Sequence, residues 1–319
     1  MEMLCVVSLI GLVGPPLTYA QNYPTRPVRM VIPFSPGGAT DVPGRILAQK
    51  LSEQFGQQVV VDNRPGAGSV VGTEVVANAP PDGYTILMTG SPFAMSPAIY
   101  RKLPYHPVKD FAPVSQFGSA PNTLVVHPSL GVRTTQELIT LAKTQPGKLD
   151  WASSGTGGAQ HLFGALFMSM AGINVTHIPY KGSGPASADL LGGQVKIGFP
   201  GIAIALPHHR AGRLRVLGVT SAKRSAQAPD VPSIAEGGVT SYDATIWFGI
   251  AAPRATPETI IKQLHAAIAR ALQAPDLRQT FAGAGTDVVS GTTAEFAALV
   301  QKEIATWARV VREAGIVAN

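Results

Sequence analysis

The sequence predicts an α/β protein with two domains, and three observations carry this prediction. The chain has 319 residues, which corresponds to two domains at roughly 150 residues each. Apolar runs with the character of strands alternate with helix-like patterns, which indicates parallel or mixed sheets covered by helices on both faces. The hydrophobic content of 45% is enough for two cores and excludes an intrinsically disordered chain, while 34 glycines and 27 prolines exclude a coiled coil.

Short apolar runs bounded by turn residues predict the strands. They cover 28–34, 59–61, 84–89, 150–153, 177–180, 195–199, 214–220 and 243–252. The run at 28–34 is followed by the turn Ser-Pro-Gly-Gly, and the run at 150–153 leads into a second glycine-rich turn. Both turns precede helix-like segments, so each predicts a β-α unit.

Capping residues and apolar stripes predict the helices. Thr40 or Asp41 can cap the first helix, and Thr134 with Glu137 forms a capping-box pattern before a second one. The remaining predicted helices run through 162–170, from 256–258 onward and from 292–295 onward. The last two carry apolar residues on one side and are predicted to pack against a sheet.

The N-terminal segment resembles an export signal. Residues 3–14 are apolar but too short to span a membrane, and small residues at Thr18 and Ala20 suit a signal peptidase. We therefore expect residues 1–20 to be a signal peptide cleaved near Ala20, which implies a periplasmic protein. Glu2 stands where basic residues are usual, so the position of the true start stays open. The single cysteine, Cys5, lies in this segment.

Several classes of function lack their sequence signature. Residues 66–72 are one residue too long for the dinucleotide pattern G-x-G-x-x-G, and no phosphate-binding G-x-x-x-x-G-K-[ST] occurs. The adjacent His208 and His209 have no further ligands near them, so we expect no metal site and no cofactor. Ser153 and His161 lie close in sequence without an orienting acid, which argues against a hydrolytic triad. Basic residues are scattered, which argues against nucleic-acid binding.

Two glycine turns are candidate anion sites. Residues 31–39 are echoed by 151–159, and Gly-Gly-Ala precedes a helix in both copies. Such a helix start presents unpaired N–H groups and the positive end of the helix dipole. Glycine is also required for the geometry of β-α turns alone, but two related turns in a chain of net charge +6 favour a carboxylate or phosphate between two lobes.

A third glycine turn follows Tyr180. Tyr180 or Lys181 is a candidate for the cleft lining, and a surface position is the alternative for Lys181. Asp41 fits a helix cap better than an acid catalyst.

Ordered motifs along the whole chain after residue 20 resemble the Bug-type receptors, the extracytoplasmic solute receptors of tripartite tricarboxylate transporters. The motifs are YPTRP at 23–27, VIPFSPGGATD at 31–41, VVVDNRPGAG at 59–68, PDGYT at 81–85, LPY at 103–105, DFAP at 110–113, PYKG at 179–182, LLGGQV at 190–195, VTSAKR at 219–224 and WFG at 247–249. Each motif alone is weak, and the ordered set is specific.

The resemblance implies a periplasmic-binding-protein fold of the second type, with two α/β lobes, a ligand cleft and two crossover strands. We expect residues 21–122 plus 247–319 to form lobe 1 and residues 123–246 to form lobe 2. The resemblance further implies that the protein closes on a small carboxylate and delivers it to membrane permease subunits. We expect a monomer without enzymatic activity. A receptor that docks on a sensor protein, or an enzyme that uses the same cleft, are the alternatives.

The resemblance also implies the ligand-binding residues. They are Phe34, Pro36, Gly37, Gly38, Ala39 and Thr40 in the first turn, Ser154, Gly155, Thr156 and Gly157 in the second, and Ser91 nearby. Tyr180 and Lys181 of the third turn, and Asp41 as a helix cap beside the site, complete the candidate set. Many relatives carry Asp where this chain has Pro200. With Asp41 as the remaining carboxylate in these loops, we expect a dicarboxylate or aromatic carboxylate without an ammonium group.

Overall fold

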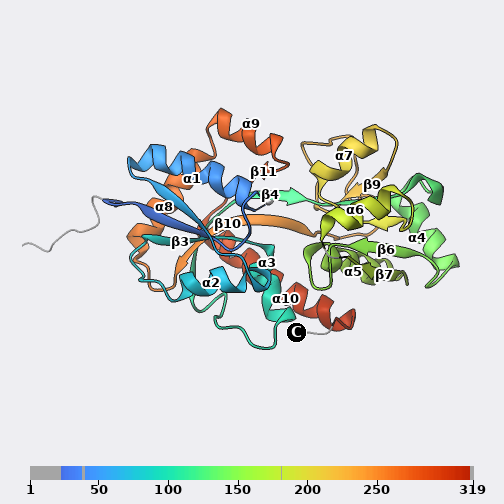
Figure 1. Ribbon diagram of the computed structural model, residues 1–319, viewed down its shortest axis with the longest axis horizontal. Coiled ribbons are helices and arrows are strands. Elements are labelled where there is room, and N and C mark those ends of the chain that lie inside the picture. The colour runs from blue at the N-terminus through green and yellow to red at the C-terminus, as the bar shows by residue number, and fades with distance from the viewer. Residues whose placement is uncertain (1–22, 38–39, 181, 317–319) are drawn as a thin grey trace, which may run out of the picture.

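The computed structural model describes residues 23–37, 40–180 and 182–316, and it has two α/β lobes side by side, each built around its own sheet (Figure 1). Both sheets are mixed, which is one of the two alternatives that the sequence left open. The signal-peptide prediction lies outside the described residues.

The sheet of the first lobe has six strands in the order β11-β4-β10-β3-β1-β2. The strands are β1 (Val28–Ile32), β2 (Val59–Asn63), β3 (Thr85–Gly90), β4 (Phe111–Pro121), β10 (Thr245–Pro253) and β11 (Asp287–Val288). β1 pairs in parallel with β2 and β3, whereas β10 runs antiparallel to both β3 and β4. The carboxyl ends of β1 and β3 therefore meet at one edge, where the chain turns into helices.

The sheet of the second lobe has five strands in the order β7-β6-β8-β5-β9. The strands are β5 (Thr123–Val126), β6 (Asp150–Ser153), β7 (Thr176–Pro179), β8 (Ile197–Gly198) and β9 (Arg215–Val219). β6 pairs in parallel with β7 and β8, and β5 runs antiparallel to β8 and β9. The second glycine turn follows β6, in the middle of this parallel group.

The chain passes between the sheets at two adjacent points. β4 ends at Pro121 in the first sheet and β5 begins at Thr123 in the second, so Asn122 marks the first passage. The chain returns at β10, where Ala244 still donates its N–H to the Thr220 carbonyl (2.9 Å). The Asn122 N–H donates to Thr220 Oγ1 (2.9 Å), which ties the two passages together.

Helices cover both faces of each sheet. In the first lobe they are α1 (Asp41–Phe55), α2 (Val70–Ala77), α3 (Ser91–Ile99), α8 (Glu258–Ala271), α9 (Pro275–Gly283) and α10 (Thr293–Glu313), with a 3-10 turn η1 at Ala67–Ser69. In the second lobe they are α4 (Thr135–Thr144), α5 (Ala159–Ala171), α6 (Ser183–Leu191) and α7 (Ile202–Arg210), with η2 at Pro128–Leu130. No described helix is both long and apolar enough to cross a membrane.

The last helix packs against both lobes. Phe296 and Val300, in the first half of α10, are buried in the core of the first lobe. Trp307, further along the same helix, is fully buried in the second lobe and stacks on Phe163 at a centroid distance of 5.6 Å. We keep residues 122/123 and 246/247 as the proposed lobe boundaries, with α10 as a helix shared between the two cores.

The structure corrects several local predictions. The first strand ends at Ile32 rather than at residue 34. Thr134 caps α4, but the Glu137 carboxylate accepts from the Arg133 N–H (2.7 Å) instead of closing a capping box. The predicted box at the start of α10 is complete, with Thr292 as the capping residue. β4, α2, α3 and α9 were not predicted.

Candidate functional site

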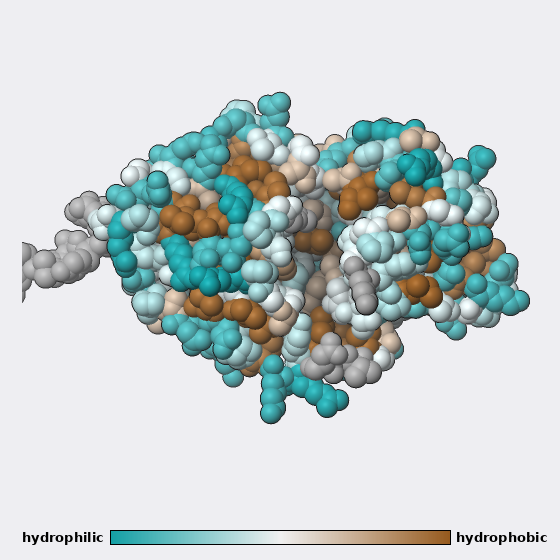
Figure 2. All heavy atoms as spheres, in the orientation of Figure 1, coloured by the Kyte–Doolittle hydropathy of each residue, from teal (hydrophilic) through white to brown (hydrophobic). Residues whose placement is uncertain are grey.

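A cavity of about 230 Å³ opens between the lobes, at the ends of the strands that precede the glycine turns. Figure 2 shows the molecule hollowed between the lobes. The lining residues come from both lobes: Phe34, Gly68, Pro92, Met95, Ser96, Ile99 and Tyr100 from the first, and Thr156, Gly157, Gly158 and Ala159 from the second. The cavity is smaller than the roughly 300–1,000 Å³ of pockets for drug-sized ligands, so it suits a small molecule.

Asp41 organises the first glycine turn rather than capping α1. Its carboxylate is 1% exposed; Oδ2 accepts from the Gly37 N–H (2.8 Å) and Arg45 Nε (2.8 Å), and Oδ1 accepts from Asn63 Nδ2 (2.7 Å). Burial alone raises the pKa of Asp41, but the hydrogen bonds from Arg45, Asn63 and Gly37 outweigh it and hold this pKa below its ordinary value. The predicted cap is therefore wrong. Thr40 has helical backbone angles and makes no capping hydrogen bond either, because a capping residue needs an extended backbone.

The second glycine turn is held by two histidines. The Gly157 N–H donates to Nδ1 of His161 (2.9 Å), four residues further along at the start of α5. Ser153 Oγ lies 2.7 Å from Nε2 of His177 on β7 and accepts from the Gly155 N–H (3.2 Å). Because these N–H groups have partners within the protein, the turn is fixed before a ligand arrives.

The predicted ligand contacts differ in their distance from the cavity. Three of them, Phe34, Thr156 and Gly157, line its wall. Pro36 and Gly37 are exposed on the first turn, Thr40 is half-buried, and Ser154 and Gly155 are half-buried within the second turn. Gly38, Ala39 and Lys181 lie outside the described residues.

Two predicted contacts have other partners. Ser91 is fully buried at the start of α3, where its hydroxyl donates to the Thr245 carbonyl (3.1 Å) and accepts from the Trp247 N–H (3.0 Å). Tyr180 donates its hydroxyl proton to Asp189 Oδ2 (2.7 Å). Burial and the neighbouring Asp189 raise the pKa of Tyr180 to about 12, so this hydroxyl stays protonated.

Tyr100 is the lining residue of greatest chemical interest that sequence reasoning missed. It follows α3, and its hydroxyl approaches Gly68 so closely that a Cβ at Gly68 would lie 2.8 Å from it. Gly68 also has φ +61°, a conformation that favours glycine. The glycine-rich segment 66–68 was visible in the sequence, but its encounter with Tyr100 depends on tertiary packing.

The electrostatics of the cavity suit an anion. No carboxylate side chain is among its described lining residues. Ala159 begins α5, and Pro92 lies in the first turn of α3, so two helix N-termini contribute positive dipole ends to the wall. Thr156 and Tyr100 also line the cavity, and each carries a hydroxyl group that can donate a hydrogen bond.

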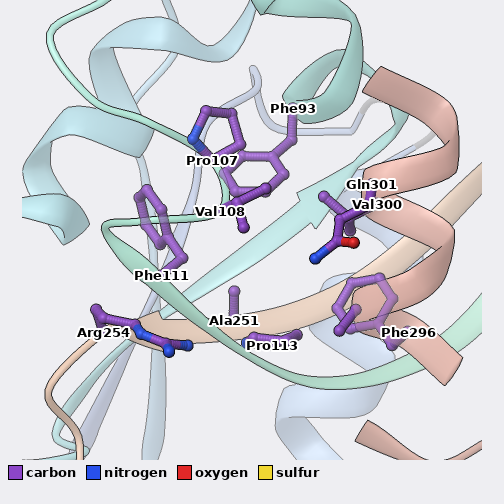
Figure 3. Close-up of a pocket in the computed structure, with 11 residues that line it drawn as sticks. Phe93, Pro107, Val108, Phe111, Pro113, Ala251, Arg254, Phe296, Val300 and Gln301 are labelled. Carbon is purple, nitrogen blue, oxygen red and sulfur yellow. The ribbon is translucent and has the colours of Figure 1, made fainter. Parts of the chain in front are cut away.

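A second cavity, of about 190 Å³, lies within the first lobe between α3, α10 and the strands β4 and β10. Its walls are mostly apolar, including Phe93, Phe111 and Phe296, with Arg254 and Gln301 as the polar side chains labelled in Figure 3. No described residue of either glycine turn lines it. The interlobe cavity is therefore the candidate site that joins the features singled out in the sequence.

The described residues near the cavity are poorly placed for covalent catalysis. The Ser153 hydroxyl contacts His177 rather than His161, but Ser153 is 0% exposed and cannot reach a molecule in the cavity. Burial lowers the pKa of both histidines to about 4, which makes them weak bases. Among the described residues, no group of three or more potential metal ligands comes together.

Comparison with known proteins gives concordant results. The model of the tripartite tricarboxylate transporter family receptors matches residues 44–316. Protein BugT of Bordetella pertussis is 39% identical over 323 residues and covers 99% of each chain. Among solved structures, R. palustris Rpa4515 with adipate is 36% identical with a TM-score of 0.78, covering 93% of this chain and 100% of that one. MatC of Rhodopseudomonas palustris with bound malate is 31% identical with a TM-score of 0.74, covering 91% and 100%.

Proposed function

Because the chain belongs to the tripartite tricarboxylate transporter receptor family, we propose that it captures a small carboxylate in the interlobe cavity and delivers it to a membrane permease. Members of this family are solute-binding receptors rather than enzymes. We further propose that the protein acts in the periplasm as a monomer, after cleavage of residues 1–20.

One observation carries the proposal: a small cavity, with no acid among its described lining residues, is walled by the second glycine turn, by Gly68 and by helix starts from both lobes. A carboxylate there would accept hydrogen bonds from the Thr156 and Tyr100 hydroxyls and from unpaired N–H groups of the first turn of α5. Since Gly37 and Gly157 donate their N–H groups within the protein, we do not assign those two groups to the ligand.

The ligand class follows from the charges around the cavity. Asp41 is the acid of the first turn, and both of its oxygens already accept hydrogen bonds. A ligand ammonium would therefore meet no free carboxylate among the described residues that line the cavity, and we propose a dicarboxylate or an aromatic carboxylate rather than an amino acid. The related structures with adipate and with malate support a dicarboxylate.

A thermal-shift screen with monocarboxylates, dicarboxylates and aromatic carboxylates tests this proposal. A ligand at about 100 times its Kd adds about 2.7 kcal/mol to the free energy of unfolding. For a protein of this size, that corresponds to a rise in Tm of about 4 °C. We expect such a rise for at least one dicarboxylate or aromatic carboxylate. A panel without any shift, or calorimetric binding that is tighter for aspartate than for succinate, would contradict the proposal.

Delivery to a permease is a separate claim and needs a cellular test. Cells that lack this gene should lose uptake of the carboxylate identified in the screen, and the gene carried on a plasmid should restore it. Unchanged uptake in the deletion strain would leave ligand capture standing and contradict the transport role.

A further inference from the structure

We propose that His161 and His177 are positioning residues of the carboxylate site, which hold the second glycine turn, residues 153–157, in the shape that lines the cavity. This inference rests on the proposed function, because it assigns the pair a role in binding the same ligand. Neither histidine is among the lining residues of the cavity. Both act through the turn.

His161 fixes the end of the turn. It lies in the first helical turn of α5, is 7% exposed, and accepts the Gly157 N–H at Nδ1 (2.9 Å). A nitrogen that accepts this hydrogen bond carries no proton, so the ring is neutral, with its proton on Nε2. Protonation of Nδ1 would replace an attractive contact with two opposing N–H groups and release Gly157.

His177 fixes the beginning of the turn through Ser153. Nε2 of His177 lies 2.7 Å from Ser153 Oγ, and the same oxygen accepts the Gly155 N–H (3.2 Å). The contact depends on the parallel pairing of β6 with β7, which places Trp151 beside His177. Thr156 therefore lies between two glycines whose N–H groups are both held, and its side chain is directed by a fixed backbone.

Stacking makes the two histidines a single unit. Their rings lie 3.9 Å apart between centroids and are 5° from parallel. The Trp151 ring, 2% exposed, lies 4.4 Å from that of His177 and 5.7 Å from that of His161. The close packing of the three rings restrains the directions of the two nitrogen atoms that reach the turn.

The charged groups around the pair are few. His161 and His177 line a depression on the protein surface, separate from the interlobe cavity, and Glu313 at the end of α10 lines it as well. The Glu313 carboxylate accepts a hydrogen bond from Ser169 Oγ of α5 (3.2 Å). Asp150 on β6 accepts a hydrogen bond from the Lys196 N–H (3.2 Å), and Asp189 on α6 accepts one from the Tyr180 hydroxyl. None of these carboxylates accepts a hydrogen bond from the imidazoles, so nothing offsets the cost of protonating them. Burial lowers the pKa of both histidines to about 4, and the nearby ring of His161 lowers the pKa of His177 further.

Because the hydrogen bonds to the histidines order the turn before the ligand arrives, binding does not carry the entropy cost of ordering it. The expected result is a higher affinity for the ligand. The loss of one neutral hydrogen bond corresponds to roughly a five- to tenfold change in Kd. The chain offers a matched pair of substitutions at the same position. In His161→Asn the side-chain oxygen replaces Nδ1 as the acceptor without titrating, whereas His161→Leu has similar size and no acceptor.

Calorimetric titration with adipate at pH 7.5 provides the first test. We expect His161→Leu to bind about five- to tenfold more weakly than the wild type, and His161→Asn to bind within about threefold of it. His208→Leu, on α7, is the control for loss of an imidazole elsewhere and should leave Kd unchanged. Equal affinities of the Leu and Asn variants would overturn the proposal, because a packing role alone does not distinguish them.

The second test needs no ligand and does not use the Leu variant, so it decides the question even if that variant does not fold. In a nuclear magnetic resonance titration from pH 7.5 to pH 4, the Gly157 amide signal of the wild type should move with the His161 ring. The same signal should not move in His161→Asn. A Gly157 amide that ignores pH in the wild type would overturn the proposal. If the wild type binds no carboxylate at pH 7.5, the proposed function fails and the role in ligand positioning fails with it, whereas the amide titration still decides whether His161 holds the turn.

Discussion

Substitution of Thr220 by valine should destabilise the protein, because this side chain holds the backbone of Asn122 at the first passage between the lobes. The Thr220 hydroxyl accepts the Asn122 N–H (2.9 Å) and donates to the Asn122 carbonyl (3.1 Å). Both residues are buried, with exposures of 0% and 2%. Valine has nearly the same shape, so the change removes the hydroxyl and leaves the packing in place.

The size of the effect follows from the groups left behind. The Asn122 carbonyl keeps a hydrogen bond from the backbone N–H of residue 220 (2.9 Å). The Asn122 N–H loses its partner, and a buried unsatisfied donor costs about 1–3 kcal/mol. The added methyl group regains less than about 0.8 kcal/mol of apolar burial. We therefore expect a loss of about 2 kcal/mol in the free energy of unfolding.

Urea denaturation of Thr220→Val and Thr140→Val measures this loss. Thr140 is exposed on α4 and its hydroxyl donates to the Gln136 carbonyl (2.9 Å), so its substitution should change stability by less than about 0.5 kcal/mol. The slope m should be the same in both variants, because the surface exposed on unfolding does not change. A Thr220→Val variant as stable as the Thr140→Val control would refute the reasoning.

Three further predictions concern stability. Burial lowers the pKa of His161 and His177 to about 4, from about 6.5 in the unfolded chain, so the unfolded state binds more protons in this window. The free energy of unfolding should therefore fall as pH falls from about 6.5 to about 4, and an equally steep fall in the double variant His161→Asn, His177→Gln would contradict this origin. Gly164→Ala places a Cβ against the buried Trp151 ring and should lower the free energy of unfolding by about 1–3 kcal/mol, despite the better helix propensity of alanine. Thermal unfolding measures this loss, and a raised Tm would show that the ring moves freely. Thr292→Ala removes the capping box of α10 and should cost about 1 kcal/mol, and an unchanged denaturation midpoint would argue against it.

Local sequence patterns were sufficient for the β-α units and for β10, but not for β4, the strand that leads to the first passage between the lobes. β6 and β9 coincide with short apolar runs bounded by turns, and their pairing adds little to what the pattern indicates. β4 was missed because Pro113 and Gly118 interrupt its pattern, and its strand conformation depends on antiparallel pairing with β10, more than a hundred residues away in the chain. α3 contains Pro92 and Pro97, which conceal a helix in the sequence.

In the candidate site, too, some features could be predicted from the sequence and others depend on the fold. Thr156 and Gly157 belong to a glycine turn that the sequence displays, and they line the cavity. The spacing of Gly157 and His161 is also visible, but the contact of His177 with Ser153 requires β6 and β7 to lie side by side. Asp41 was misassigned because a carboxylate at a helix start has two uses, and only the fold of the first turn places it on Gly37.

Binding of a small carboxylate between the lobes is the central claim, and calorimetric titration of adipate and malate at pH 7.5 tests it most directly. The proteins to compare are the wild type, Tyr100→Phe, Thr156→Val and the exposed control Thr144→Val. We predict saturable binding of at least one dicarboxylate by the wild type and the control. Loss of one hydrogen bond to a charged group should weaken binding by about 10- to 150-fold in Tyr100→Phe or Thr156→Val. Binding that is equally tight in all four proteins, or absent from the wild type, would contradict the account.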